Sequence, residues 1–183
     1  MEQLNNAVAA LKKGSVIICP TDTVYGFLAD ATNKKAVDKI YKIKRRPKTK
    51  PLSLFVKSIS MARQIAEIDM RQSKLLKKYW PGKVTAVLKR KTGTKLYGVK
   101  KDNIAIRIPG HPFLQKLLKK IDRPLVQTSV NLAGQEPLNS IADITTTFGK
   151  TRLVGLIIDG GRAKNAKSSK ILDLTTKHLT RIR

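Results

Sequence analysis

The segment 20–26, Pro-Thr-Asp-Thr-Val-Tyr-Gly, is the first of four polar clusters that could do chemistry. Thr21, Asp22 and Thr23 place three short oxygen-bearing side chains directly after an apolar run, 15–19, which we expect to be a buried strand. Proteins of the α/β class bind ligands beyond the ends of their strands, so these side chains could hydrogen-bond a substrate. A turn closed by its own threonine and aspartate hydrogen bonds is an equally good interpretation.

The second cluster is a group of cations around Pro47. Six of the nine positions from 42 to 50 are basic, namely Lys42, Lys44, Arg45, Arg46, Lys48 and Lys50. The dipole at a helix C-terminus favours a cation by only about 0.3 to 1 kcal/mol. That effect accounts for one or two of these charges, whereas a triphosphate or an RNA backbone would account for the set.

The third cluster surrounds Arg107, which interrupts an apolar strand expected over 104–108. A buried guanidinium without a partner is costly, so Arg107 needs an anion. An ion pair within the protein and a substrate carboxylate are both suitable, and the shortage of acidic residues favours the substrate. His111 precedes Pro112, and we interpret it as a polar residue at a helix start rather than a catalytic one.

The fourth cluster, Gln127-Thr128-Ser129-Val130-Asn131, follows another expected strand with hydroxyls and amides suited to phosphate oxygens or a nucleotide. Ser129 has no recognisable histidine and aspartate partners for nucleophilic catalysis. The chain also lacks a Gly-x-x-x-x-Gly-Lys-Ser/Thr phosphate loop. Covalent serine catalysis and P-loop hydrolysis are therefore both disfavoured.

The elements that must position these clusters alternate between strands and helices. Hydrophobic periodicity and capping residues predict helices near 4–13, 33–44, 60–79 with a break near Asp69, 112–118 and 140–148. They predict strands near 15–19, 52–56, 84–88, 104–108, 125–128, 153–158, 171–174 and 179–182. Some connections are too short for helical crossovers, so we expect an α/β fold with a mixed parallel and antiparallel sheet flanked by helices. No linker or repeat is visible, which predicts one domain over 1–183.

Composition points to an anionic partner. The 183 residues include 38 Lys or Arg against 12 Asp or Glu, giving a net charge of +26. Such a charge favours polyanions, although many of the lysines can be ordinary solvated surface. Cys19 stands alone and only two histidines accompany it, so we expect neither a disulfide nor a zinc site. We see no signal peptide or membrane helix, and we expect a cytoplasmic protein.

Taken in order, these clusters resemble the YrdC/TsaC family of L-threonylcarbamoyladenylate synthases over almost the whole chain. The matching segments are Pro20-Thr21-Asp22-Thr23-Val24-Tyr25-Gly26, Lys44-x-Arg46-Pro47 followed by Pro51-Leu52, Trp80-Pro81-Gly82, Arg107-x-Pro109-x-His111-Pro112, Ser129-x-Asn131 with Gly134, and Asp159-Gly160-Gly161 with Ser169. The tetrad of this family, Lys-x-Arg with Ser-x-Asn, falls on Lys44, Arg46, Ser129 and Asn131.

The resemblance implies a nucleotidyltransferase that makes threonylcarbamoyl-AMP and pyrophosphate from ATP, L-threonine and bicarbonate for the t6A modification of tRNA. It also implies a twisted sheet around a basic concave surface, with magnesium carried by ATP rather than by a protein site. Lys44, Arg46 and Lys50 would offset triphosphate charge, and Thr23 and Arg107 would contact threonine. Ser129, Asn131 and Ser169 would line the nucleotide side. Thr21 and Tyr25 complete the implied substrate-binding set.

The resemblance further implies the short bacterial form, whose product passes to separate threonylcarbamoyl-transfer proteins. The stretch 163–168 is a candidate for closing over the labile carbamate. The alternative interpretation is a non-catalytic module that binds tRNA or double-stranded RNA through its basic surface. The scarcity of aromatic residues, 5% of the chain, argues against a surface that stacks single-stranded bases.

Overall fold

The structure is a computed structural model that describes residues 1–162, 168–176 and 180–182. Its elements are α1 (Glu2–Lys12), β1 (Val16–Cys19), β2 (Gly26–Asp30), α2 (Lys34–Lys44), β3 (Ser53–Phe55), α3 (Ile59–Ile65), α4 (Met70–Tyr79), β4 (Val84–Lys89), β5 (Asn103–Arg107), α5 (Pro112–Ile121), β6 (Leu125–Ser129), α6 (Ile141–Phe148), β7 (Val154–Ile157), β8 (Lys170–Asp173) and β9 (Thr180–Arg181).

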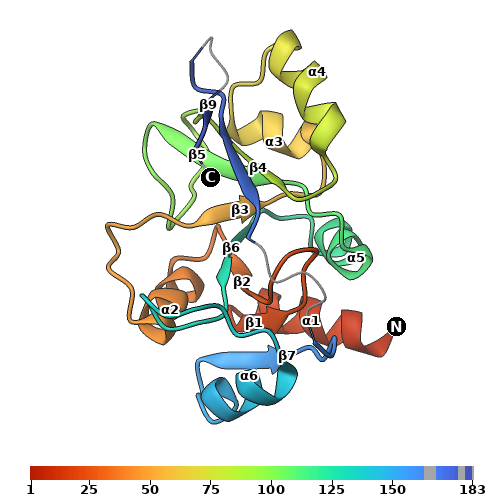
Figure 1. Cartoon of the computed structure of the whole chain (residues 1–183), viewed down its shortest axis with the longest axis vertical. Helices are drawn as coiled ribbons and strands as arrows, with labels where there is room; N and C mark the ends of the chain where they lie inside the picture. Colours follow the sequence, from red (N-terminus) through yellow and green to blue (C-terminus); the bar gives the residue numbers. More distant parts are fainter. Residues whose placement is uncertain (163–167, 177–179, 183) are drawn as a thin grey trace.

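The strands of the described residues form one nine-stranded sheet in the order β7-β1-β2-β6-β3-β5-β4-β8-β9. Figure 1 shows this sheet along the long axis of the molecule, with β7 toward one end and β9 toward the other. The pairs β1–β7, β3–β5 and β4–β8 are parallel, and the remaining pairs are antiparallel. The predicted α/β class with a mixed sheet and flanking helices is therefore confirmed. The single domain over 1–183 and the basic concave surface stay predictions.

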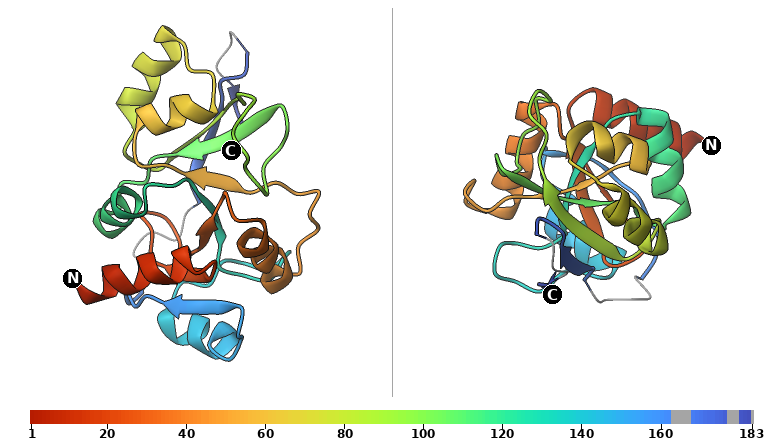
Figure 2. Two further views of the ribbon diagram at one scale, coloured as in Figure 1. Left: turned by 180° about the vertical axis from the view of Figure 1, so that it is seen from behind. Right: turned by 90° about the horizontal axis from the view of Figure 1, so that it is seen from above.

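Alternate residues of β1 separate the two faces of the sheet. Ile17 and Cys19 pack in one apolar cluster with α1 and α5, while Val16 and Ile18 belong to a second cluster that includes residues of α2 and α6. Figure 2 shows α1 and α5 on the face seen from behind. All four side chains of β1 are fully buried, which explains why its sequence, Val-Ile-Ile-Cys, is apolar throughout rather than alternating.

The helix boundaries follow local chemistry that the sequence displays. The Asn33 side chain caps α2 by accepting a hydrogen bond from the Ala36 amide at 3.1 Å. Asp69 separates α3 from α4 and forms a reciprocal capping box with Gln72. Pro112 occupies the first turn of α5, where its missing amide hydrogen costs nothing. The predicted break near Asp69 and the predicted start of α5 are both confirmed.

Strand β2 is the element that the sequence pattern did not predict. Its residues Gly-Phe-Leu-Ala-Asp contain no β-branched side chain, and Gly and Asp are both uncommon in strands. The strand is nevertheless completely buried between β1 and β6, with which it pairs antiparallel. Its terminal Asp30 is tolerated in the interior because the Arg123 guanidinium lies 2.7 Å from the carboxylate. Tertiary pairing therefore overrides a weak local preference here.

Candidate active site

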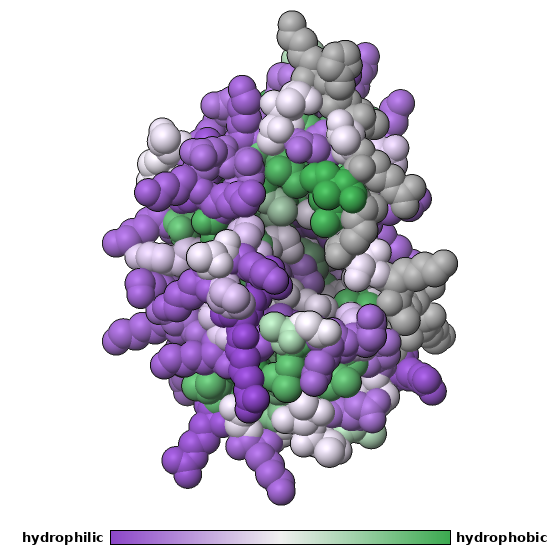
Figure 3. Space-filling model, turned by 60° about the vertical axis from the view of Figure 1, so that its left-hand side comes forward, coloured by the Kyte–Doolittle hydropathy of each residue, from purple (hydrophilic) through white to green (hydrophobic). Residues whose placement is uncertain are grey.

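A cavity of about 440 Å³ lies over the sheet at β3, β4, β5, β6 and β8. Five of the predicted site residues line it: Thr23, Arg46, Arg107, Ser129 and Ser169. These residues are separated by up to 146 positions in the chain, and strand pairing brings them together. Figure 3 shows a hollow in one face of the molecule with many hydrophilic residues around it. The chain thus gathers cations and hydroxyls around one cavity.

Three sequence motifs converge on the Arg107 guanidinium, which is 2% exposed. Arg107 Nε donates to the Gly82 carbonyl at 2.8 Å, and Nη1 donates to Thr23 Oγ1 at 3.3 Å. Nη2 donates to the Asp22 carboxylate, which forms an ion pair with it. The partner of Arg107 in the structure is thus an internal acid, not the substrate carboxylate that the shortage of acids led us to favour. A contact with substrate in addition stays a prediction.

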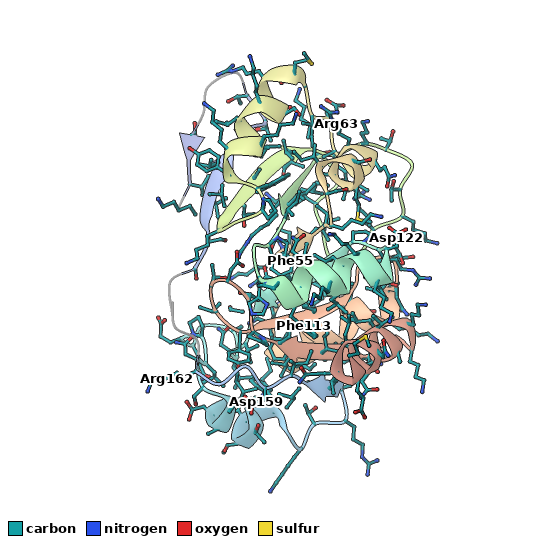
Figure 4. All side chains as sticks on the ribbon, turned by 90° about the vertical axis from the view of Figure 1, so that its right-hand side faces the viewer. Phe55, Arg63, Phe113, Asp122, Asp159 and Arg162 are labelled. Carbon is teal, nitrogen blue, oxygen red and sulfur yellow. The ribbon has the colours of Figure 1, made fainter. Side chains whose placement is uncertain are left out.

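The surroundings of Arg107 stabilise its charge despite its burial. Its guanidinium carbon lies 5.4 Å from the centre of the Phe55 ring, close enough for a cation–π contact. Phe55 is part of the apolar cluster with α5, and Figure 4 labels it beside that helix, where Phe113 also lies. Burial lowers the pKa of Arg107 to about 10, so the side chain is still charged at neutral pH.

Lys44 is the other buried cation, at 1% exposure, and it lies behind the cavity rather than in its lining. Its ammonium group donates to the Ser129 carbonyl at 2.6 Å, to the Asn131 carbonyl at 2.9 Å and to Asn131 Oδ1 at 2.8 Å. Three acceptors use all three ammonium donors. Burial, and secondarily the nearby Arg46, lower the pKa of Lys44 to about 8.

The loop after β6 is held tightly around Asn131. Ser129 Oγ donates to Asn131 Oδ1 at 2.6 Å, and Asn131 Nδ2 donates to the carbonyls of Leu132 and Gln135 at 2.8 and 2.7 Å. Lys44 and Asn131 therefore form the base of this loop. Ser129 is the member of the Ser-x-Asn pair that lines the cavity.

Arg46 and Lys50 lie on the loop that follows α2. Arg46 lines the cavity, and its guanidinium donates to the carbonyls of Lys50 and Pro51 at 3.3 and 3.0 Å. Lys50 is exposed, and its side chain is not part of the cavity lining. A third cation of this loop, Lys48, pairs with Asp38 of α2 at 2.6 Å. The dense basic run thus contributes one side chain, Arg46, to the cavity wall.

Two other predicted site residues of segment 20–26, Thr21 and Tyr25, do not line the cavity and make hydrogen bonds within the protein. Thr21 Oγ1 lies 2.9 Å from Thr23 Oγ1 and donates to the Val24 carbonyl at 2.7 Å. Tyr25 Oη donates to the Gly161 carbonyl at 2.7 Å and accepts from the Gly160 amide at 2.9 Å. A side chain at position 160 would collide with Pro20, which explains a glycine there. The hydrogen bonds expected of a turn are therefore present, and ligand binding by this segment stays a prediction.

The last glycine motif begins at Asp159, which Figure 4 labels on the turn after β7. Asp159 Oδ1 accepts from the Gly161 amide at 2.7 Å, which closes this turn. The chain then continues toward Ser169, whose hydroxyl lies 2.9 Å from Thr85 Oγ1 in the cavity wall. The candidate closing stretch 163–168 lies outside the described residues except for Ser168.

Several polar residues of the cavity were missed by the sequence reasoning: Ser53, Thr85, Lys100, Asn103 and Asp173. Gln127 and Thr128 were included in the fourth cluster but not assigned a role. Ser53 Oγ donates to Gln127 Oε1 at 2.9 Å across the β3–β6 pair. Thr85 lies inside β4, so only a polar residue in an otherwise apolar strand could have signalled it, whereas Ser53 is the first residue of β3.

His111 occupies the N-cap position of α5 but makes no capping hydrogen bond through its side chain. Its Nδ1 is buried without a hydrogen-bond partner, and burial lowers its pKa. It does not belong to the cavity lining, in keeping with its interpretation as a residue at a helix start. Within the described part of the chain, no group of three or more His, Cys, Asp or Glu side chains is placed to hold a metal ion.

Comparisons with known proteins agree with this arrangement. The Sua5/YciO/YrdC family model, described as telomere recombination, matches residues 9–183. The threonylcarbamoyl-AMP synthase of Aliivibrio fischeri is 33% identical over 185 residues, which cover 99% of each chain. That of Klebsiella pneumoniae is 32% identical, over 98% of this chain and 95% of its own.

Solved structures give the same result. Escherichia coli YciO superposes with a TM-score of 0.88 at 29% identity, covering all of this chain and 88% of its own. Pyrococcus abyssi Sua5 complexed with L-threonine gives a TM-score of 0.88 at 30% identity, over 98% of this chain. The match spans 53% of the Sua5 chain, about half its length.

The fold and the relatives that match nearly the whole chain therefore define an enzyme, a transferase. The chain belongs to the Sua5/YciO/YrdC family. No helix among the described residues is long and apolar enough to cross a membrane.

Proposed function

We propose that this chain is a threonylcarbamoyl-AMP synthase acting as a nucleotidyltransferase. The amino group of L-threonine forms a C–N bond to the bicarbonate carbon, water is lost, and an oxygen of the resulting carbamate attacks the α-phosphate of ATP. A new P–O bond forms to the carbamate, the bond between the α- and β-phosphates breaks, and pyrophosphate leaves. The observation that carries the proposal is that Arg107, Thr23, Arg46 and Ser129 line one and the same cavity. Relatives that match nearly the whole chain are named for this activity.

The two sides of the cavity suit two different anions. Arg107 and Thr23 would hold the carboxylate and hydroxyl of threonine, because a guanidinium and a hydroxyl can bond both groups. Arg46, with the Ser129 and Ser169 hydroxyls, would contact the phosphates and nucleotide. Positioning two anions and offsetting their charge lowers the barrier without a covalent enzyme intermediate. Lys44 and Asn131 would act by shaping the loop that presents Ser129.

Magnesium would arrive with ATP. Mg²⁺ retains several waters and is bound chiefly through substrate phosphates in many nucleotide enzymes, so it needs few protein ligands. Asp173 is an acidic residue in the cavity lining and could bind a metal-bound water. The proposal includes passage of the product to separate transfer proteins for t6A synthesis, and a cytoplasmic location.

The test is pyrophosphate release from ATP with threonine and bicarbonate omitted in turn. We expect release only when both are present. Arg46→Ala and Ser129→Ala should lower kcat/KM by at least about tenfold, because the first removes a cation and the second a hydroxyl from the cavity wall. Exposed Lys12→Ala, remote from the cavity, is the control and should retain activity. Release without threonine, or unchanged activity in both site variants, would contradict the proposal.

RNA binding is a second candidate, favoured by the net charge of +26. It is compatible with catalysis, since lysines on other surfaces can bind a phosphate backbone while the cavity turns over small substrates. The two properties separate in salt: RNA affinity falls steeply as counterion release loses its advantage, whereas threonine-dependent turnover should fall less. Binding of tRNA at physiological salt without any pyrophosphate release would instead favour the non-catalytic module.

A further inference from the structure

Asp22 contacts a residue of the cavity wall without being part of the wall itself. It does not line the cavity, but one carboxylate oxygen forms an ion pair with Arg107 Nη2, which does. The other oxygen accepts the Gly110 amide at 2.8 Å. The Asp22 side chain is 12% exposed, so this pairing is largely shielded from water. One carboxylate thus joins the guanidinium to the backbone that follows β5.

The hydrogen bonds of Arg107 leave little freedom in its orientation. A guanidinium has five N–H donors in one plane. Nε is used by Gly82, one Nη2 proton by Asp22 and one Nη1 proton by Thr23. Because acceptors on three sides fix the plane, the two remaining N–H groups have fixed directions, and Arg107 is part of the cavity lining. Of these three partners, Asp22 alone carries charge.

Packing restricts Asp22 in the same way. A Cβ added at Gly110 would lie 3.3 Å from Asp22 Oδ2 and 3.5 Å from the Gly82 Cα. The carboxylate and two backbone segments therefore meet at close quarters. Glycine at position 110 leaves the space in which the Asp22 carboxylate reaches both its partners.

We infer that Asp22 is a positioning residue that orients Arg107 for the carboxylate of the amino-acid substrate. This role rests on the proposed function, because it assigns Asp22 to the threonine side of that site. The carboxylate fixes the guanidinium plane before substrate binds, so the bound substrate does not have to order it. Asp22 also offsets part of the Arg107 charge, which leaves geometry as the basis for selecting a planar carboxylate over other anions.

The chain supplies a matched control in a second aspartate–arginine pair. Asp30, the last residue of β2, is 1% exposed, and its carboxylate oxygen Oδ2 lies 2.7 Å from Arg123 Nη1. Neither residue lines the cavity. Asp30→Asn therefore removes a buried carboxylate charge from an arginine pair that has no part in the proposed site. Any loss common to Asp22→Asn and Asp30→Asn reflects folding, and any difference reflects the site.

The experiment compares L-threonine with L-threonine amide, which lacks the carboxylate, by calorimetric binding to the full chain. Wild-type protein should prefer threonine strongly. Asp22→Asn should weaken threonine binding by at least about tenfold and reduce the threonine-to-amide preference, with the KM for ATP changed less than about threefold. Asp30→Asn should retain the wild-type preference. An unchanged preference in Asp22→Asn would overturn the inference.

A second readout does not depend on substrate. NMR of arginine side chains reports rotation of the Arg107 guanidinium, which should be slow in wild type and in Asp30→Asn, and faster in Asp22→Asn. Equal rotation in all three proteins would show that Asp22 does not position Arg107. If wild-type protein binds no threonine, the proposed function fails, whereas the rotation measurement still decides whether Asp22 fixes the guanidinium.

Discussion

Two buried cations, Lys44 and Arg107, belong to the candidate site, and their partners differ in kind. Lys44 is bonded by two backbone carbonyls and one side-chain amide oxygen, all of them neutral. Arg107 is bonded by a carbonyl, a hydroxyl and the Asp22 carboxylate. In the part of the chain that the structure describes, Lys44 makes no ion pair, whereas Arg107 makes one.

Because their partners differ, the two cations are expected to contribute differently: Lys44 through its charge, and Arg107 through the orientation of its N–H groups. Because no acid neutralises Lys44, its field adds to that of Arg46 on the side proposed for phosphates. The charge of Arg107 is partly balanced by Asp22, so on the threonine side the directions of its N–H groups carry more of the selectivity. If both cations were exposed to solvent, water and salt would screen the charge of Lys44, and the guanidinium of Arg107 would be free to rotate.

The largest expected effect comes from Arg107→Met. This change leaves the Asp22 carboxylate without its cation in a shielded place, so we expect the free energy of unfolding to fall by about 3 to 5 kcal/mol. Threonine-dependent pyrophosphate release should become undetectable. Urea unfolding and the release assay measure the two effects.

The control for this prediction is Asp22→Asn combined with Arg107→Met. If the ion pair causes the loss, the double variant should be more stable than Arg107→Met alone, because no unpaired carboxylate remains. Simple addition of the two single losses would refute that explanation.

Lys44→Met should have a smaller effect on stability, because no acid is left unpaired. The carbonyls of Ser129 and Asn131 lose their donor, which we expect to cost about 1 to 3 kcal/mol. Activity should fall as the Ser129 loop loosens. A loss equal to that of Arg107→Met would erase the distinction between the two cations.

Lys44 is also expected to make stability depend on pH. Its pKa is about 8 in the folded chain against an ordinary 10.5. Between these values the unfolded chain binds the proton that the folded chain has released, so stability rises with pH. Wild type should therefore gain in free energy of unfolding relative to Lys44→Met from pH 8 to 10.5, as measured by urea titrations across this range.

Turnover should change in the opposite direction over the same range. A neutral amine has two N–H donors instead of three, so one acceptor near Ser129 would lose its hydrogen bond. We expect activity to fall above pH 8 while stability rises. A stability difference that is flat with pH would mean that Lys44 keeps its proton throughout.

Much of the architecture was predictable because its signals are local. Asn33, Asp69 and Pro112 mark helix starts through hydrogen bonds that span only a few residues. The apolar runs predicted all the strands except β2, whose Phe27 and Leu28 stand between Gly and Ala. No local preference identifies β2, because its stability comes from pairing with β1 and β6 on either side.

The candidate groups could be identified from residue type and spacing alone: the two threonines of segment 20–26, Lys44, Arg46, Arg107 and the Ser-x-Asn pair, in a chain short of acids. That Arg107 has Asp22 as its partner, and that Lys44 lies outside the cavity lining, became visible in the folded chain. Both outcomes depend on contacts between segments 85 to 87 positions apart. Side-chain type and spacing along the chain are local properties, whereas the partner of a buried charge is set by the strand pairing that buries it.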